Sequence, residues 1–202
     1  MINRTFFFDH ARLNLFDGSM STKQVSGMTD ILDEWEANHA AQDDRWLAYA
    51  LGTAHHETGR TMQPIKEWGG NAYFTRMYDP PPAGQRPQVA AVLGNVNPGD
   101  GPLFCGRGYV QLTGRKNYTT WGTKLGINLV GNPTLAMDPK VAVKIMFDGM
   151  IAGSFTGKKL GNYFSGTVED WRNARRIING LDKADLVASY GKKYYGCISH
   201  TT

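Results

Sequence analysis

Cysteine is scarce in this chain, and long apolar runs are missing. The 202 residues include two cysteines, Cys105 and Cys197, which lie far apart and form no Cys-x-x-Cys pair. A disulfide framework or a cysteine-based metal site is therefore not expected, and we predict two buried free thiols. No apolar stretch reaches the roughly 18 residues that a membrane-spanning helix needs, so we expect no stable membrane insertion.

Concentrated charge is also missing. The chain carries 22 Lys and Arg residues against 18 Asp and Glu, a formal net charge of +4, in which no basic run exceeds two residues. This mild excess suits an anionic partner such as a bacterial wall, whereas nucleic-acid binding is not expected without a basic stripe interleaved with aromatic residues. The first ten residues lack the apolar stretch of a signal peptide, so we expect accumulation in the cytoplasm.

The overall composition is that of a globular protein, with many turn-forming residues. A hydrophobic fraction of 41% with 20% charged residues fits one folded domain over residues 1–202. The glycines and prolines concentrate between positions 59 and 133. We therefore predict an α+β, predominantly α-helical fold. Its helical body covers residues 1–59 and 106–202, and a smaller lobe of loops and short strands covers about 60–105.

Hydrophobic periodicity of the helical kind accounts for the body. An apolar stripe with Ser21 as a cap predicts a helix over 21–38, and two aspartates open a second helix over 43–57. Further helices are predicted by similar patterns, over about 116–125, from 138–139 onward, over about 168–179 and over about 182–195. The segment 109–113 is typical of a short strand.

Glu57 is a candidate general acid because it ends the second predicted helix. Trp46, Ala50, Thr53 and Glu57 recur at i, i+4, i+7 and i+11, so they share one largely apolar face. Desolvation and the negative end of the helix dipole both disfavour a charged carboxylate there, which keeps a proton available for acid catalysis. The alternative is a structural carboxylate that reaches solvent or pairs with Arg60.

Hydrolysis of a sugar bond with inversion also needs a carboxylate that activates water. Glu67, ten residues after Glu57, is the first candidate for this base, Asp79 the second and Asp100 a distant third. A solvated loop charge is the alternative for each. Aromatic residues gather in the same lobe, where they fit a sugar-stacking surface or a small core equally well: Trp68, Tyr73, Phe74 and Tyr78.

His55 and His56 directly precede Glu57 and raise the question of a metal site. The zinc motif His-Glu-x-x-His places its histidines one helical turn apart, whereas adjacent residues point about 100° apart on a helix. We therefore predict no metal and no cofactor. One histidine is expected to pack or hydrogen-bond near the acid, and the other to be partly exposed.

Two separated motifs carry a family resemblance. The segment Ala-His-His-Glu-Thr-Gly at 54–59 ends a predicted helix, and Gly-Arg-Gly-Tyr-Val-Gln-Leu-Thr at 106–113 is followed by Asn117 and Tyr118. These motifs resemble the His-Glu-Thr motif and the second signature of glycoside hydrolase family 19, which comprises chitinases and related phage endolysins. With Asn132-Pro133 and Asp138-Pro139, the resemblance spans about residues 47–147.

The resemblance implies a lysozyme-like fold and a glycosidase that inverts the anomeric centre. Glu57 would then be the general acid, Glu67 the general base, and Thr113 the hydroxyl residue that positions the attacking water. An inverting mechanism implies a carboxyl separation of about 6.5–9.5 Å. The candidate substrate-binding residues are Gln111 and Asn117, which match amides of the family, together with Trp68, Tyr73, His56 and Arg107.

The opening segment at 6–21, the shorter loops and the missing cysteine framework resemble the phage and prophage members, which degrade peptidoglycan. We therefore expect a monomeric endolysin that binds the glycan strands of peptidoglycan. It would reach the periplasm and wall after a holin permeabilises the membrane, and so lyse the host cell. A chitinase with the same machinery, a lytic transglycosylase and a non-catalytic wall-binding protein stay open as alternatives.

Overall fold

The computed structural model describes residues 1–201, and it is predominantly helical with little strand, as the sequence predicts. The chain divides into two compact units. The first comprises Met1–Gln63 and the chain from Val143 onward, and the second comprises Pro64–Ala142. Among the described residues, no helix is long and apolar enough to cross a membrane.

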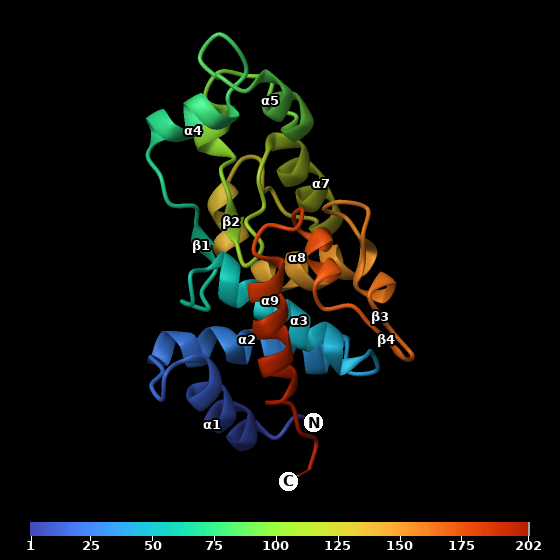
Figure 1. Ribbon diagram of the computed structural model, residues 1–202. Coiled ribbons are helices and arrows are strands. Elements are labelled where there is room, and N and C mark those ends of the chain that lie inside the picture. Colours follow the sequence, from blue (N-terminus) through green and yellow to red (C-terminus); the bar gives the residue numbers. More distant parts are fainter. Residues whose placement is uncertain (202) are drawn as a thin grey trace. The chain divides into compact units, whose positions relative to one another are not determined.

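Helices dominate the first unit (Figure 1). They are α1 (Arg4–Leu15), α2 (Thr22–Asn38), α3 (Asp44–Glu57) and α9 (Ala184–Tyr195), with the short 3₁₀ helices η2 (Leu160–Asn162) and η3 (Asn173–Ile177). A hairpin of β3 (Phe164–Ser165) and β4 (Val168–Glu169) completes it, and α8 (Pro139–Ala152) contains the boundary between the units. The helices predicted over 21–38, 43–57 and 182–195 are confirmed as α2, α3 and α9.

Helix α3 is the centre of the first unit. Its residues Leu47–His55 are all buried, and α9 packs along it (Figure 1). The two helices meet at Gly52 and Gly191, where a Cβ on Gly52 would come within 2.7 Å of the Gly191 nitrogen. Only glycine allows this close approach of two backbones. The crossing therefore fixes α3, and with it the position of Glu57 at its end.

The second unit consists of short helices around a two-stranded ribbon. Strands β1 (Ile65–Lys66) and β2 (Arg107–Gly108) pair antiparallel. The helices are α4 (Asn71–Tyr78), α5 (Pro87–Leu93), α6 (Asp100–Leu103) and α7 (Arg115–Leu125), with the 3₁₀ helix η1 (Pro133–Met137). The structure thus differs from the predicted loops and short strands over 60–105, because the glycines and prolines there separate short helices.

Two other predicted elements are wrong. The segment 109–113 is not a strand, because Gln111 takes a left-handed conformation (φ 54°) that ends the extended run after β2. The segment 168–179 holds β4 and η3 instead of one helix, because its first residues pair with β3 as a strand and the 3₁₀ helix starts only at Asn173. The prediction of two buried free thiols is confirmed for Cys105 and Cys197.

Candidate active site

Glu57 is held by a buried cation of the same unit. The Arg175 Nη1 donates a 2.6 Å hydrogen bond to Glu57 Oε1, and the exposed fractions of the two side chains are 3% and 17%. Arg60, the partner considered from the sequence, binds Asp17 instead, at 2.7 Å. The candidate acid is therefore fixed at the end of α3 by a charge-assisted hydrogen bond from a buried guanidinium.

Arg175 is a site residue that the sequence interpretation missed. It lies in η3, 118 positions after Glu57, and its Nε donates to the Asp182 carbonyl at 3.0 Å. A single arginine in a segment taken for an ordinary helix gives no local sign that its guanidinium will be buried. Only the folded chain brings it against α3.

The two histidines before Glu57 have different surroundings. His55 is fully buried, its Nδ1 lies 2.9 Å from the Tyr194 hydroxyl, and its ring packs against Tyr190. Burial, followed by nearby positive groups, lowers the pKa of His55 to about 4, so the ring is neutral near pH 7. His56 is half-buried; burial lowers its pKa, and the adjacent Glu57 opposes that shift. The predicted division into a packed and a partly exposed histidine is confirmed.

The possible metal-ligating side chains of the described residues lie apart from one another. Among residues 1–201, no group of three or more histidine, cysteine, aspartate or glutamate side chains is placed to hold a metal ion. The surroundings of His55 and His56 agree with this, because His55 faces an aromatic interior whereas His56 neighbours a carboxylate.

Glu67 lies in the second unit, directly after β1, and its carboxylate accepts two hydrogen bonds. The Tyr78 hydroxyl donates to Oε1 at 2.9 Å, and the Gly106 backbone N–H donates to Oε2 at 3.1 Å. The backbone N–H of Glu67 donates in turn to the Gly106 carbonyl at 2.8 Å. Burial, followed by Glu67, holds the pKa of Tyr78 above its ordinary value, so Tyr78 remains a donor. Both groups that bind the Glu67 carboxylate are therefore neutral donors.

The other two base candidates are committed to the backbone. Asp79, only 2% exposed, accepts hydrogen bonds from the N–H groups of Gly99 and Gly101. Asp100 accepts from Val96 and Asn97 and pairs with Arg115 at 2.5 Å. Both carboxylates are buried and shape the turn around residues 95–101. Of the three candidates, Glu67 alone keeps a half-buried carboxylate with access to solvent.

The second motif brings its polar residues together around Gly106. A Cβ at Gly106 would lie 2.8 Å from Gln111 Oε1 and 3.1 Å from Glu67 Oε2, so both oxygens approach the same glycine. The Thr113 hydroxyl donates to the Gln111 carbonyl at 2.8 Å, and Asn117 Nδ2 donates to the Thr113 carbonyl at 2.7 Å. Glu67, Gln111, Thr113 and Asn117 thus form one connected set within the second unit.

Arg107, expected among the substrate contacts, is mostly buried. The residue is 6% exposed, and its Nη1 donates to the carbonyls of Leu103 and Cys105 and to the Tyr118 hydroxyl. The guanidinium therefore also has a structural role, and its contact with substrate stays a prediction. The guanidinium fixes the backbone before β2 and so supports Gly106.

The aromatic cluster of the second unit divides into core and surface. Phe74 is fully buried and stacks on Tyr78, and Tyr73 contacts it edge-on. Trp68 is 76% exposed and directly follows Glu67. An exposed indole face next to a candidate base is suited to stacking on a sugar ring.

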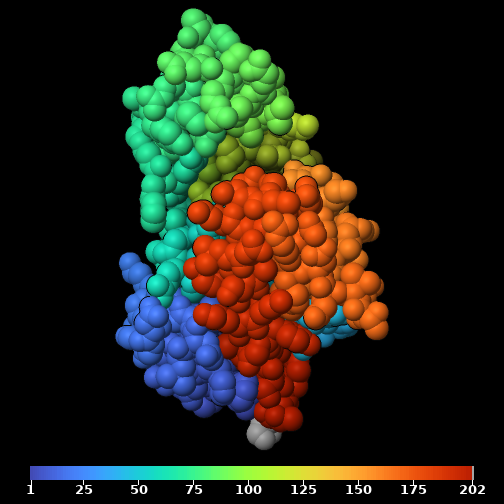
Figure 2. Space-filling view, viewed as in Figure 1, coloured from blue at the N-terminus to red at the C-terminus, as the bar shows by residue number. Residues whose placement is uncertain are grey.

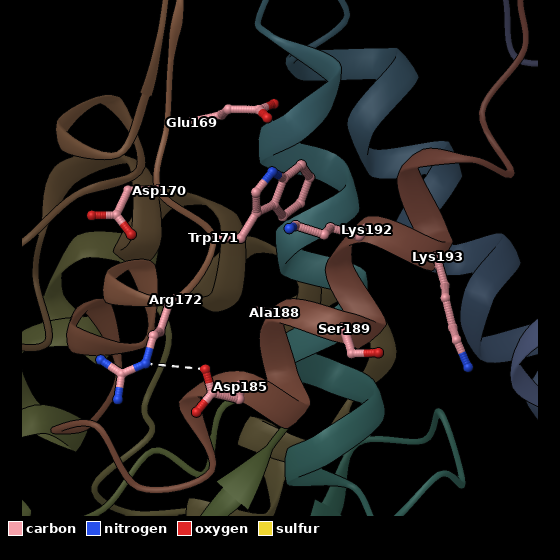
Figure 3. Close-up of a pocket in the computed structure, with 9 residues that line it drawn as sticks. All are labelled: Glu169, Asp170, Trp171, Arg172, Asp185, Ala188, Ser189, Lys192 and Lys193. Atoms are coloured by element: carbon pink, nitrogen blue, oxygen red, sulfur yellow. Dashed lines mark hydrogen bonds and ion pairs between the residues drawn. The ribbon is translucent and has the colours of Figure 1, made fainter.

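A separate surface hollow lies in the first unit. Its volume is about 510 Å³, and it is lined by residues 169–172 and by the outer face of α9 (Figure 3). Figure 2 shows these two segments, orange and red, side by side on the visible face. Charges of both signs line it, among them the exposed pair Arg172–Asp185 at 3.0 Å. None of the residues predicted from the motifs lines this hollow.

Comparison with known proteins defines the class of fold. No family model matches the chain. A 40-residue segment, 20% of the chain, is 50% identical to Chitinase 8 of Oryza sativa subsp. japonica, and it spans only 15% of that protein. The structure of chitinase C from Streptomyces griseus HUT6037 is similar over 94% of this chain and 74% of that chain, with a TM-score of 0.53 and 23% identity. A mutant of chitinase C gives a TM-score of 0.52 at the same identity and coverage.

These similarities confirm the predicted fold. The chain has a predominantly helical, lysozyme-like fold similar to that of chitinase C, which agrees with the fold that the motif resemblance implies. Glu57, Glu67, Thr113, Gln111 and Asn117 keep their status as predicted site residues, now with defined surroundings. Because Glu57 belongs to the first unit and Glu67 to the second, the carboxyl separation also stays a prediction.

Proposed function

We propose that the chain is an inverting glycoside hydrolase that cleaves β-1,4 bonds between N-acetylated amino sugars. The observation that carries this proposal is the contrast between two carboxylates that stand at the motif positions. Glu57 accepts a hydrogen bond from a buried guanidinium, whereas Glu67 accepts from two neutral donors, a tyrosine hydroxyl and a backbone N–H. Carboxylates with different environments are suited to separate acid and base roles. The chitinase-like fold supports the same assignment.

In this proposal Glu57 protonates the glycosidic oxygen and Glu67 removes a proton from the attacking water. The Thr113 hydroxyl uses its hydrogen to bond the Gln111 carbonyl, so its oxygen lone pairs remain to accept from that water. Trp68 would stack on a sugar ring beside the base. The acid, the base and the water-positioning hydroxyl are thus three different side chains, each with the donor or acceptor atom that its role needs.

Within this class of substrate we propose peptidoglycan, with the chain acting as an endolysin that a holin admits to the wall. The formal net charge of +4 favours an anionic wall polymer. Chitin is the second candidate, because both the matching segment of Chitinase 8 and the similar structure of chitinase C belong to proteins named as chitinases. Both polymers contain β-1,4 bonds between N-acetylated sugars.

Digestion of purified peptidoglycan and of chitin hexamers by the parent and by Glu57→Gln would test the proposal. Mass spectrometry identifies the new ends, and proton NMR of fresh chitin products reports their anomeric form. We expect products that vanish in the glutamine variant, and α-anomers at first appearance, because inversion converts a β-bond to an α-product. Anhydro ends would indicate a transglycosylase instead. Undiminished activity in a folded Glu57→Gln variant would remove the acid assignment.

A further inference from the structure

Two buried hydroxyls lie on the same strip of α3 as Glu57. Tyr49, Thr53 and Glu57 follow one another at intervals of four residues, so each lies one turn above the last on one face of the helix. Tyr49 and Thr53 are both 0% exposed. Their hydroxyl oxygens make no hydrogen bond to any atom within residues 1–201. Buried polar groups usually have hydrogen-bond partners, so two buried hydroxyls without partners on the helix of the candidate acid indicate a functional role.

Thr53 does not satisfy its hydroxyl in the way that other helical threonines of this chain do. Thr29 and Thr58 donate to the carbonyl four residues before them, at 2.9 and 2.7 Å. Thr53 makes no such bond to the Tyr49 carbonyl. Its hydroxyl is therefore available to the interior of the first unit rather than tied to the helix backbone.

Arg175 is the charged group bound to Glu57 at the end of this strip. Its Nη1 binds Glu57, and its Nε binds the Asp182 carbonyl. Burial raises the pKa of the Tyr49 hydroxyl, Arg175 lowers it, and Glu57 raises it, so both members of the ion pair act on Tyr49. Thr53 lies between Tyr49 and Glu57 on the strip. The Tyr49 hydroxyl is therefore close enough to both charges to be affected by them, and the Thr53 hydroxyl lies one turn nearer to Glu57 on the same helix.

We propose that Tyr49 and Thr53 are positioning residues that accept hydrogen bonds from Arg175 while Glu57 carries its proton. A general acid must be neutral before it acts, and a neutral carboxyl accepts more weakly from a guanidinium than a carboxylate does. A buried guanidinium that loses its acceptor is costly, because it has five donors and accepts nothing itself. The two hydroxyls offer free lone pairs for these donors. They thereby stabilise the protonated state of Glu57, which is the state that the proposed function requires.

Other titratable groups around the pair are the same in the parent and in the hydroxyl variants. His56 is the titratable neighbour on α3, and Asp182 and Lys183 lie between η3 and α9. Tyr163 and Asp170 are the further titratable groups that act on Tyr49. Removing one hydroxyl changes none of these charges. A change in the titration of Glu57 in such a variant therefore reports the hydroxyl itself.

Carbon-13 NMR titration of the glutamate carboxyls tests the proposal without any substrate. The variants are Thr53→Val and Tyr49→Phe, with Glu57→Gln used to assign the Glu57 signal. We expect the midpoint of the Glu57 titration to fall by about 0.5–1 pH unit in each variant, because the protonated state loses an acceptor for Arg175. Thr53→Ser should restore the parent midpoint. The control Thr29→Val, which removes a back-bonded hydroxyl, should leave it unchanged.

The outcomes separate this inference from the proposed function on which it rests. If the midpoint of Glu57 stays at its parent value in folded Thr53→Val and Tyr49→Phe, the positioning role is wrong even where the parent cleaves glycan. If the midpoints shift in a protein that cleaves no glycan, the hydroxyls act on Glu57 and the hydrolase proposal fails. In an active enzyme, the alkaline limb of kcat should shift downward by the same amount while KM is unchanged.

Discussion

Arg175 and Glu57 form a 2.6 Å ion pair between residues that lie 118 positions apart in the sequence. The pair joins η3 to the end of α3, so the candidate acid and its cation are fixed by two separate elements of the first unit. The strength of this pair decides how firmly Glu57 is held at the end of α3.

Replacing Arg175 by methionine should lower the free energy of unfolding by about 2–3 kcal/mol, because Glu57 would be left partly buried without its cation. Urea denaturation measures this loss. The double variant with Glu57→Gln should recover part of it, since no charge is then left uncompensated. Strictly additive effects in the double-mutant cycle would mean that the two residues do not stabilise each other.

The buried His55 should make the fold sensitive to mild acid. Its folded pKa of about 4 lies below the ordinary value of 6.5, so between these values the unfolded chain binds the proton more readily. Stability should therefore fall as the pH decreases from 6.5 to 4, by about 3 kcal/mol in all. Urea denaturation at four pH values measures this slope. It should flatten in His55→Phe and persist in the surface control His200→Asn.

Glu67 and Asp79 should respond in opposite ways to amide substitution. Glu67→Gln is expected to lower kcat about 10²–10⁴-fold, because an amide cannot take a proton. Thermal unfolding should change little, because the amide oxygen can accept from the Gly106 N–H while the amide nitrogen donates to the Tyr78 hydroxyl. Asp79→Asn is expected to lower the free energy of unfolding by about 1–3 kcal/mol, because its amide nitrogen cannot accept from Gly99 or Gly101. The specific activity of the folded fraction should remain. An active, folded Glu67→Gln would return the base assignment to another residue.

The close crossing of α3 and α9 should tolerate no added methyl group. Gly52→Ala would place a Cβ 2.7 Å from the backbone nitrogen of Gly191, so the helices must separate. We expect a loss of about 1–3 kcal/mol in the free energy of unfolding. Gly180→Ala is the matched control, because a Cβ there meets no atom within 4 Å. Equal stability of the two variants would show that the crossing can relax.

Much of the fold could be predicted because its helices carry local signals. Helix α2 has an apolar stripe and a capping box at Ser21, and α3 begins after Asp43, so the pattern and the ends agree. Most helices of the second unit are too short for a hydrophobic periodicity to be recognised in their sequence. The strand predicted after β2 failed at Gln111, where the backbone turns left-handed at a residue other than glycine.

The candidate site was predictable only where it lies in motifs. Glu57, Glu67 and Thr113 were named from local sequence and from the family resemblance, and Arg107 was placed among the ligand contacts because it belongs to the same motif. Its inward guanidinium reflects tertiary contacts that a motif does not report. Arg175, Tyr49 and Thr53 could not be recognised in the same way, because their burial depends on packing between elements that are distant in the chain.

The contacts at Gly106 have a practical meaning for protein engineering. The Glu67 carboxylate and the Gln111 amide oxygen occupy the space that a side chain at position 106 would need. The Gly106 N–H donates to the Glu67 carboxylate, and the Gly106 carbonyl accepts from the Glu67 N–H. Trp68, next to Glu67, is largely exposed and touches little. A mutant library aimed at a new glycan preference can therefore randomise position 68, while position 106 must be kept as glycine in every member.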